Sequence, residues 1–246
     1  MALQESFVKS GNFLFKKRSF LPLIILIPGF AWFAWLKYNN QWITPWWLDF
    51  IFLFVGLLGL LIRILTVGFT PKGTSGRNTS TGQVAETLNT SGIYSTIRHP
   101  LYLGNFFMWF APVLMILDFW FALFFCAAYW LYYERIMYAE EDFLRKKFNE
   151  NYINWANKTP AFIPNFKKYK KSHLLFSLKN ILKREYNGFF NLILIMTILR
   201  LISFAVIEHK FYLDLPWIII FVTGLLIFLI LKILKKFTKI LDEKDR

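Results

Sequence analysis

Cysteine and histidine are scarce in this chain of 246 residues, and their scarcity excludes two kinds of site. The single cysteine, Cys126, lies in an apolar run, so the chain has no disulfide framework and no thiolate metal site. The three histidines, His99, His173 and His209, are scattered, and no two of them have the spacing of metal ligands. The sequence therefore predicts no resident catalytic metal.

Acidic residues are also few, since 15 Asp and Glu stand against 29 Lys and Arg and leave a net charge of +14. Such a surplus is one mark of nucleic-acid binding. Here, however, hydrophobic residues make up 56% of the chain and the mean hydropathy is +0.42, outside the range of ordinary soluble domains. The basic residues flank long apolar runs, as on the face of a membrane protein next to anionic lipid. We therefore predict an all-α, polytopic integral membrane protein with no nucleic-acid partner.

Six apolar stretches are each long enough to cross the hydrocarbon layer, which takes about 20 residues. They are residues 20 to about 36, 46 to about 62, 100–116, 119–138, 189–207 and 215–231. Only Leu117 and Asp118 separate the third stretch from the fourth, which predicts a tight helical hairpin. The first stretch follows a basic N-terminus, as in a signal peptide, but its Trp and Phe content and the lack of a small-residue cleavage pattern favour a membrane span.

Basic residues concentrate in the N-terminal segment, in residues 63–100, in residues 135–188 and in the C-terminal tail. The positive-inside rule therefore predicts that both termini and the active site are cytoplasmic. Residues 63–99 form a polar loop, and residues 139–158 have the periodicity of an amphipathic helix. Residues 167–184 predict a basic helix on an anionic membrane surface, with a nucleic-acid or calmodulin-type site as the alternative.

Arg200 falls in the fifth predicted span, where a lone cation is costly unless it faces protein or water. Three explanations remain open at this point. Arg200 binds an anionic lipid head group, pairs with a neighbour such as Glu134, or extends along the helix towards the membrane interface.

One motif and one acidic pair carry the chemistry. Residues 98–105 read Arg-His-Pro-Leu-Tyr-Leu-Gly-Asn and lead from the polar loop into the third span. The predicted hairpin returns Glu140 and Glu141 to the membrane level of Arg98 and His99. Taken singly, each of these residues has a structural explanation, such as a basic anchor or a solvated helix face, so only their combination indicates a site.

In this combination the chain resembles the isoprenylcysteine carboxyl methyltransferase family and, more broadly, the integral-membrane phospholipid methyltransferases. The resemblance rests on the Arg-His-Pro motif with Tyr102 and Gly104, the Glu pair, the following Leu144, Phe148 and Tyr152, and the Pro-x-x-Ile-Pro ending at residues 160–164. It covers roughly residues 55–166 and implies a methyltransferase core there. Residues 1–54 would be N-terminal membrane helices, and residues 167–246 a basic interfacial helix with two further spans.

The resemblance implies S-adenosylmethionine as the cofactor and assigns residues to its pocket. The implied cofactor-binding residues are Glu86, Thr87, Leu88, Asn89, Tyr94, His99, Pro100, Leu101, Tyr102, Asn105 and Glu140, and the implied catalytic residues are Arg98, Arg135 and Glu141. The chain departs from the family pattern at two positions. Ile136 stands where the family has a substrate-binding arginine, although Arg135 is next to it, and Asn149 replaces the usual glycine.

The residue types also fit this cofactor on chemical grounds. A carboxylate can bind its ammonium group or ribose hydroxyls, an arginine or histidine its carboxylate, and an aromatic ring such as that of Tyr102 its sulfonium. Methyl transfer is an in-line displacement, in which positioning supplies much of the rate acceleration.

The arginines bear on the methyl acceptor. A carboxylate or phosphate oxygen is ionised at neutral pH, whereas an amine must first lose a proton. We therefore predict O-methylation of a lipid or lipid-anchored acceptor, with phospholipid N-methylation as the alternative. An NADPH-dependent reductase resembling the membrane sterol reductases and a non-catalytic lipid-binding protein are the other readings, and the sequence leaves the oligomeric state open.

Overall fold

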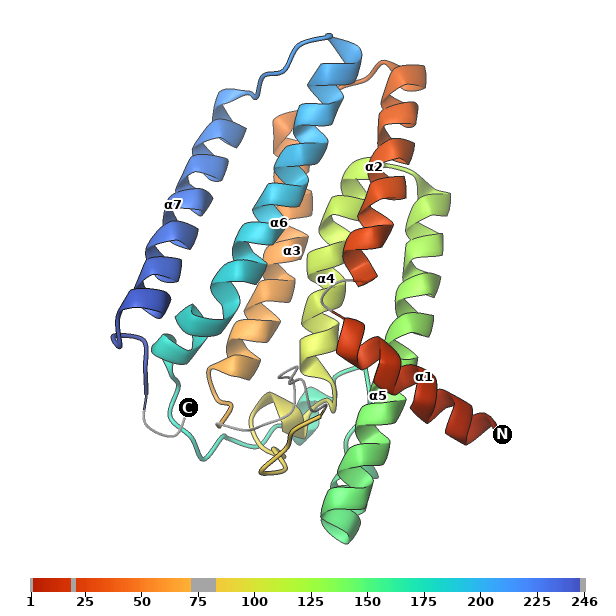
Figure 1. Cartoon of the computed structure of the whole chain (residues 1–246), viewed down its shortest axis with the longest axis vertical. Helices are drawn as coiled ribbons and strands as arrows, with labels where there is room; N and C mark the ends of the chain where they lie inside the picture. Colours follow the sequence, from red (N-terminus) through yellow and green to blue (C-terminus); the bar gives the residue numbers. More distant parts are fainter. Residues whose placement is uncertain (1, 19–20, 72–82, 244–246) are drawn as a thin grey trace.

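The computed structural model describes residues 2–18, 21–71 and 83–243, and across these ranges it is helical with no β-strand (Figure 1). The helices are α1 (Leu3–Lys17), α2 (Leu21–Asn40), α3 (Trp46–Val67), α4 (Pro100–Ile116), α5 (Phe119–Ala156), α6 (Leu178–Ile207) and α7 (Leu215–Phe237). Single 3₁₀ turns lie at Ile93–Ser95 and Phe166–Lys168. The prediction of an all-α fold is confirmed for the described part of the chain.

Five helices, α2, α3, α4, α6 and α7, run side by side along the long axis together with the first part of α5 (Figure 1). Helix α1 crosses one end of this bundle and packs on α5. Helices α3 and α4 approach most closely, because Gly59 has no side chain: a Cβ there would lie 2.4 Å from the carbonyl oxygen of Gly104. This close packing fixes α4, which carries part of the motif.

Within the described residues, three helices, α3, α6 and α7, are long and apolar enough to cross a membrane, and α4 is a shorter apolar helix. Large hydrophobic side chains on α3 and α7 are exposed, as on surfaces that face lipid. The expected hairpin is present, since Leu117 ends α4 with a positive φ of 57° and Asp118 caps α5 by accepting a hydrogen bond from the amide of Phe121. The membrane character is thus supported, whereas the number of six spans stays a prediction.

Several predicted boundaries were wrong. Helix α3 continues to Val67, so Arg63 lies within it. The predicted fourth span and the predicted amphipathic helix both fall within α5, because no Pro or Gly interrupts residues 139–148. Of the predicted interfacial helix, residues 169–177 are not helical. Its second half begins α6, where Ser177 caps the helix through the amide of Asn180. Residue 20, the predicted start of the first span, lies outside the described residues.

Arg200 lies near the end of α6 and does not pair with Glu134, so that alternative was wrong. Its guanidinium lies 2.8 Å from Asp214 and 3.2 Å from Asp49, and it donates a further hydrogen bond to the carbonyl of Thr44. Because its partners precede α7 and begin α3, this cluster joins the α2–α3 and α6–α7 connections at the end of the bundle away from α1 (Figure 1).

Candidate functional site

The motif and the acidic pair meet at the other end of the bundle. His99 Nε2 lies 2.8 Å from Glu141 Oε1, and Arg98 Nε lies 2.9 Å from the same oxygen. The hydroxyl of Tyr102 donates to Glu140 Oε2 at 3.0 Å. Two polar segments about forty residues apart in the sequence therefore form one cluster, because Pro100 begins α4 at the level where α5 carries its acids.

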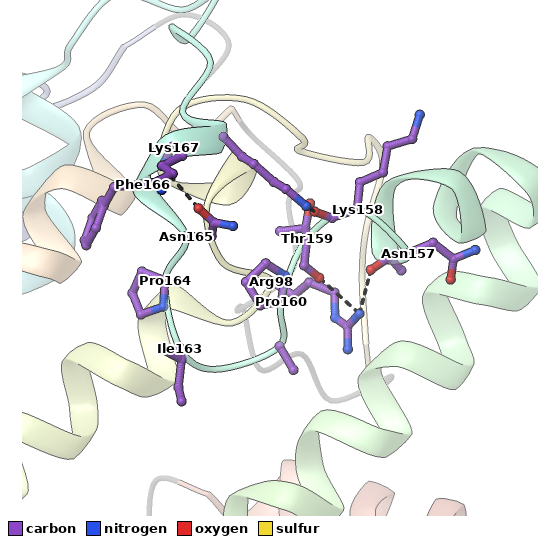
Figure 2. Close-up of a pocket in the computed structure, with 13 residues that line it drawn as sticks. Arg98, Asn157, Lys158, Thr159, Pro160, Ile163, Pro164, Asn165, Phe166 and Lys167 are labelled. Atoms are coloured by element: carbon purple, nitrogen blue, oxygen red, sulfur yellow. Dashed lines mark hydrogen bonds between the residues drawn. The ribbon is translucent and has the colours of Figure 1, made fainter.

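The chain that follows α5 holds the Arg-His loop in place. The amide of Arg98 donates to the carbonyl of Pro160 at 2.9 Å, and that of His99 to Ala161 at 3.3 Å. Nη1 of Arg98 also donates to the carbonyls of Ala156 and Thr159, at 2.8 and 3.2 Å (Figure 2). The Pro-x-x-Ile-Pro ending is thus a structural partner of the motif, which explains why the two occur together.

The cluster is buried and highly charged. His99 is 5% exposed and Glu140 6% exposed. Burial by itself lowers the pKa of His99, but the carboxylates of Glu140, 3.7 Å from Nδ1, and of Glu141, which is hydrogen-bonded to Nε2, outweigh it and raise the pKa above its usual value. Burial likewise raises the pKa of each glutamate, but the proximity and charge of His99 outweigh it, so the pKa values of Glu140 and Glu141 are both lowered. The arrangement therefore favours an imidazolium between two carboxylates.

A small cavity of about 20 Å³ opens beside this cluster. Its lining residues come from the loop before α4 and from α5: Thr87, Leu88, Asn89, Tyr94, Arg98, His99, Glu140, Leu144, Tyr152 and Trp155. A cavity of this size holds about one water molecule. Binding of a nucleoside therefore requires these walls to separate.

The backbone of α5 breaks at Asn149, and this break shapes the cavity. In a straight helix Trp155 would lie about 22 Å beyond Glu140, at 1.5 Å per residue, yet both residues line the same small space. Asn149 has φ 45° and ψ −124°, so the last turns of α5 fold back. The indole of Trp155 then donates to the carbonyl of Tyr94 at 3.1 Å. These angles lie outside the left-handed helical region that asparagine tolerates, and glycine is the residue that adopts them at least cost.

The structure places the predicted site residues in three groups. Thr87, Leu88, Asn89, Tyr94, Arg98, His99 and Glu140 line the cavity, and Tyr102 and Glu141 bond to these residues. Among the described residues, Glu86, Pro100, Leu101, Asn105 and Arg135 do not line it. The guanidinium of Arg135 instead lies 3.4 Å from the ring centroid of Phe7 in α1.

Sequence reasoning missed four residues of this region as site members. Leu144, Tyr152 and Trp155 line the cavity; their spacing indicated an amphipathic helix, and Leu144 and Tyr152 belonged to the family pattern, but none of them was assigned to the site. Arg18, which donates to the Tyr102 hydroxyl at 3.3 Å, lies in the basic N-terminal segment, where nothing in the sequence distinguishes it from its basic neighbours.

A second, larger pocket of about 850 Å³ lies on the other side of Arg98 (Figure 2). It is lined by the segment that follows α5, including Lys158, Lys167 and Lys168, and by the exposed apolar side chains of Ile163 and Phe166. Arg98 lines both this pocket and the small cavity, so its guanidinium separates a charged and partly apolar surface from the acidic cluster.

Residues 51–151 match the sequence model of the phospholipid methyltransferase family. The chain is 36% identical over 78 residues to a protein-S-isoprenylcysteine O-methyltransferase of Schizosaccharomyces pombe, covering 31% of this chain and 33% of that protein. The resemblance inferred from the motif is therefore confirmed. No solved structure matches the chain.

Two bacterial proteins match a longer part of the chain. The cobalt-zinc-cadmium resistance protein CzcN of Cupriavidus metallidurans is 30% identical over 54% of this chain and 56% of its own length. The nickel-cobalt-cadmium resistance protein NccN of Alcaligenes xylosoxydans xylosoxydans is 32% identical over 58% and 59%. The chain thus matches about one third to three fifths of the length of these three relatives.

Proposed function

We propose that this chain, whose residues 51–151 are of the phospholipid methyltransferase type, is a membrane methyltransferase that uses S-adenosylmethionine. The observation that carries the proposal is the buried cluster in which His99 and Arg98 meet Glu141 while Tyr102 binds Glu140. These residues come from the two motifs that the family resemblance rests on, and they adjoin one cavity.

The donor set fits the cofactor. S-adenosylmethionine, when bound, would supply a methyl group on a sulfonium. Glu140 would hold its ammonium group or ribose hydroxyls, His99 as the imidazolium would hold its carboxylate, and Tyr94 and Trp155 would provide aromatic surfaces for the adenine. The closing turns of α5 would exclude water from the bound group.

An anionic oxygen is the acceptor that the geometry favours. Nε of Arg98 faces Glu141 and Nη1 donates to two carbonyls, whereas Nη2 has no hydrogen-bond partner in the described part of the chain. Nη2 can therefore hold a carboxylate or phosphate oxygen that enters from the larger pocket. The neighbouring carboxylates raise the pKa of His99 and so favour its protonated form, which disfavours it as the base for an amine acceptor.

The acceptor would thus be a lipid or a lipid-anchored molecule with an anionic group, methylated on oxygen. Ile163 and Phe166 would contact the apolar part of the membrane boundary, and the lysines beside them its anionic head groups. We place this site on the cytoplasmic face, with both termini, on the basis of the positive-inside rule.

Calorimetric titration of the full chain in detergent tests the cofactor. We expect heat with S-adenosylhomocysteine and none with NADPH. Heat with NADPH alone would show a reductase, and the absence of heat with either compound would favour a non-catalytic lipid-binding protein. Mass spectrometry of lipids and lipoproteins from cells with and without the gene, searched for a shift of one methyl group, then identifies the acceptor and separates O- from N-methylation.

A further inference from the structure

A second ion pair, between Arg63 of α3 and Glu185 of α6, lies beside the first turns of α4. Arg63 Nε and Nη2 are 2.6 and 2.9 Å from the two carboxylate oxygens of Glu185. This two-point contact fixes the orientation of the guanidinium plane. The Glu185 side chain is 5% exposed and that of Arg63 20% exposed, so water competes weakly for either partner.

Arg63 also contacts α4 directly. Its Nη1 donates to Asn105 Oδ1 at 2.5 Å. The stem of Arg63 passes over Gly104, where a Cβ would lie only 2.6 Å from Cγ of the arginine. Asn105 lies three residues after Tyr102, so less than one helical turn separates the Arg63 contact from the hydroxyl that binds Glu140.

The opposite side of the same turn is held by α5. The hydroxyl of Tyr129 donates to the carbonyl of Tyr102 at 2.7 Å. The beginning of α4 is therefore fixed between α5 on one side and the Arg63–Glu185 pair on the other. Of these partners, only Glu185 lies outside residues 51–151, the segment that matches the family.

We propose that Glu185 is a positioning residue for the candidate site, acting through Arg63 and Asn105 on the first turns of α4. It keeps His99 and Tyr102 in register with the acids of α5, and it gives α6 a role in a site that α6 does not line. The consequence for cofactor binding rests on the proposed function, whereas the mechanical coupling does not.

The physical reason is the cost of leaving a buried charge unpaired. Without the Glu185 carboxylate, the one hydrogen bond that Arg63 keeps within the described part of the chain is that to Asn105, and its guanidinium becomes an uncompensated cation among apolar helices. It would then move towards water, and the Asn105 contact would be lost with it. The start of α4 would lose this restraint on its α3 side, while the contact of Gly104 with Gly59 and the hydrogen bond from Tyr129 would remain.

Hydrogen–deuterium exchange of the full chain in detergent tests the coupling without any ligand. In Glu185→Gln we expect the amides of residues 102–106 to exchange about tenfold faster or more, the factor that corresponds to one charged hydrogen bond. The matched control is Asp214→Asn, which removes the same charge from the ion pair at the other end of α6. Unchanged exchange in residues 102–106 of Glu185→Gln, or an equal increase in Asp214→Asn, overturns the proposal.

Binding of S-adenosylhomocysteine, measured by calorimetry, tests the link to the site. We expect about tenfold weaker binding in Glu185→Gln, partial recovery in Glu185→Asp and wild-type affinity in Asp214→Asn. Faster exchange with unchanged affinity overturns the positioning role. If the wild type itself binds no S-adenosylhomocysteine, the proposed function fails, while the exchange result still decides the coupling. Arg63→Lys, which keeps the charge but not the guanidinium plane, replaces Glu185→Gln if that variant does not fold.

Discussion

The strongest test of the site electrostatics is the pKa of His99 in Glu141→Gln. In the wild type we expect this pKa above the usual 6.5, because two carboxylates stabilise the imidazolium. The substitution removes one charge 2.8 Å away while burial remains. A hydrogen bond to a charged group contributes about 1.5–3 kcal/mol, and about 1.4 kcal/mol corresponds to one pKa unit. The Glu141 side chain is 23% exposed, so we expect the pKa of His99 to fall by about one unit, the lower end of that range.

Nuclear magnetic resonance can measure this pKa, because the chain has only three histidines. Carbon-13-labelled histidine signals of the full chain in detergent would be followed against pH, and a His99→Gln variant identifies the signal. Asp142→Asn is the matched control, because Asp142 is the adjacent acid but pairs with the exposed Lys146. It should shift the pKa of His99 by about half a unit or less. A pKa of His99 below 6.5 in the wild type, or no fall in Glu141→Gln, would refute the arrangement of one imidazolium between two carboxylates.

The same cluster predicts a pH window for stability. The pKa of His99 is raised in the folded protein, so its stabilisation is complete below about pH 6.5 and disappears as the pH rises through the folded pKa. The pKa values of Glu140 and Glu141 are lowered, so their stabilisation is present above about pH 4.5 and disappears as the pH falls through their folded values. The Tm difference between the wild type and Glu141→Gln should therefore be largest between these limits, and a pH-independent difference would contradict this linkage.

Three further variants test separate parts of the molecule. Glu140→Gln should weaken binding of S-adenosylhomocysteine about tenfold or more, the loss of one charged hydrogen bond, whereas Arg135→Ala, remote from the cavity, should retain wild-type affinity in calorimetry. Arg200→Met leaves the fully buried Asp49 unpaired and should cost about 3–5 kcal/mol, seen as a lower Tm with unchanged affinity per folded molecule. Asn149→Gly should raise the stability by about 1 kcal/mol, because glycine adopts its positive φ without strain; a lower Tm would contradict this.

The sequence predicted those features of the fold that local signals specify. Pro100 begins α4 at the predicted residue, and the link of Leu117 and Asp118 forms the expected hairpin. The meeting of the motif with the acidic pair followed from that hairpin, because α5 runs back along α4 and carries residues 140 and 141 to the level at which α4 begins. These predictions depended on chain length and apolar runs, which are readable without tertiary structure.

Other features depend on tertiary contacts that no local pattern reveals. Arg63 was predicted to begin a loop, but a partner 122 positions away keeps it within α3. The reversal at Asn149 could not be predicted from the sequence pattern, because the apolar residues on both sides of it keep the spacing of one continuous helix. Arg200 was predicted to lie in mid-membrane, and its true partners are Asp49 in the first turn of α3 and Asp214 just before α7. For Arg63 and Arg200 the partners lie far away in the sequence, so no local pattern identifies them.

The reversal at residue 149 divides α5 into a part that carries the acidic pair and a part that carries aromatic cavity residues. The acids stand on the long, tightly packed arm of α5, and the aromatic wall formed by Tyr152 and Trp155 stands on the short arm beyond the bend. A change in two backbone angles at that bend would swing the wall aside and admit a molecule far larger than a water, while the carboxylates kept their places.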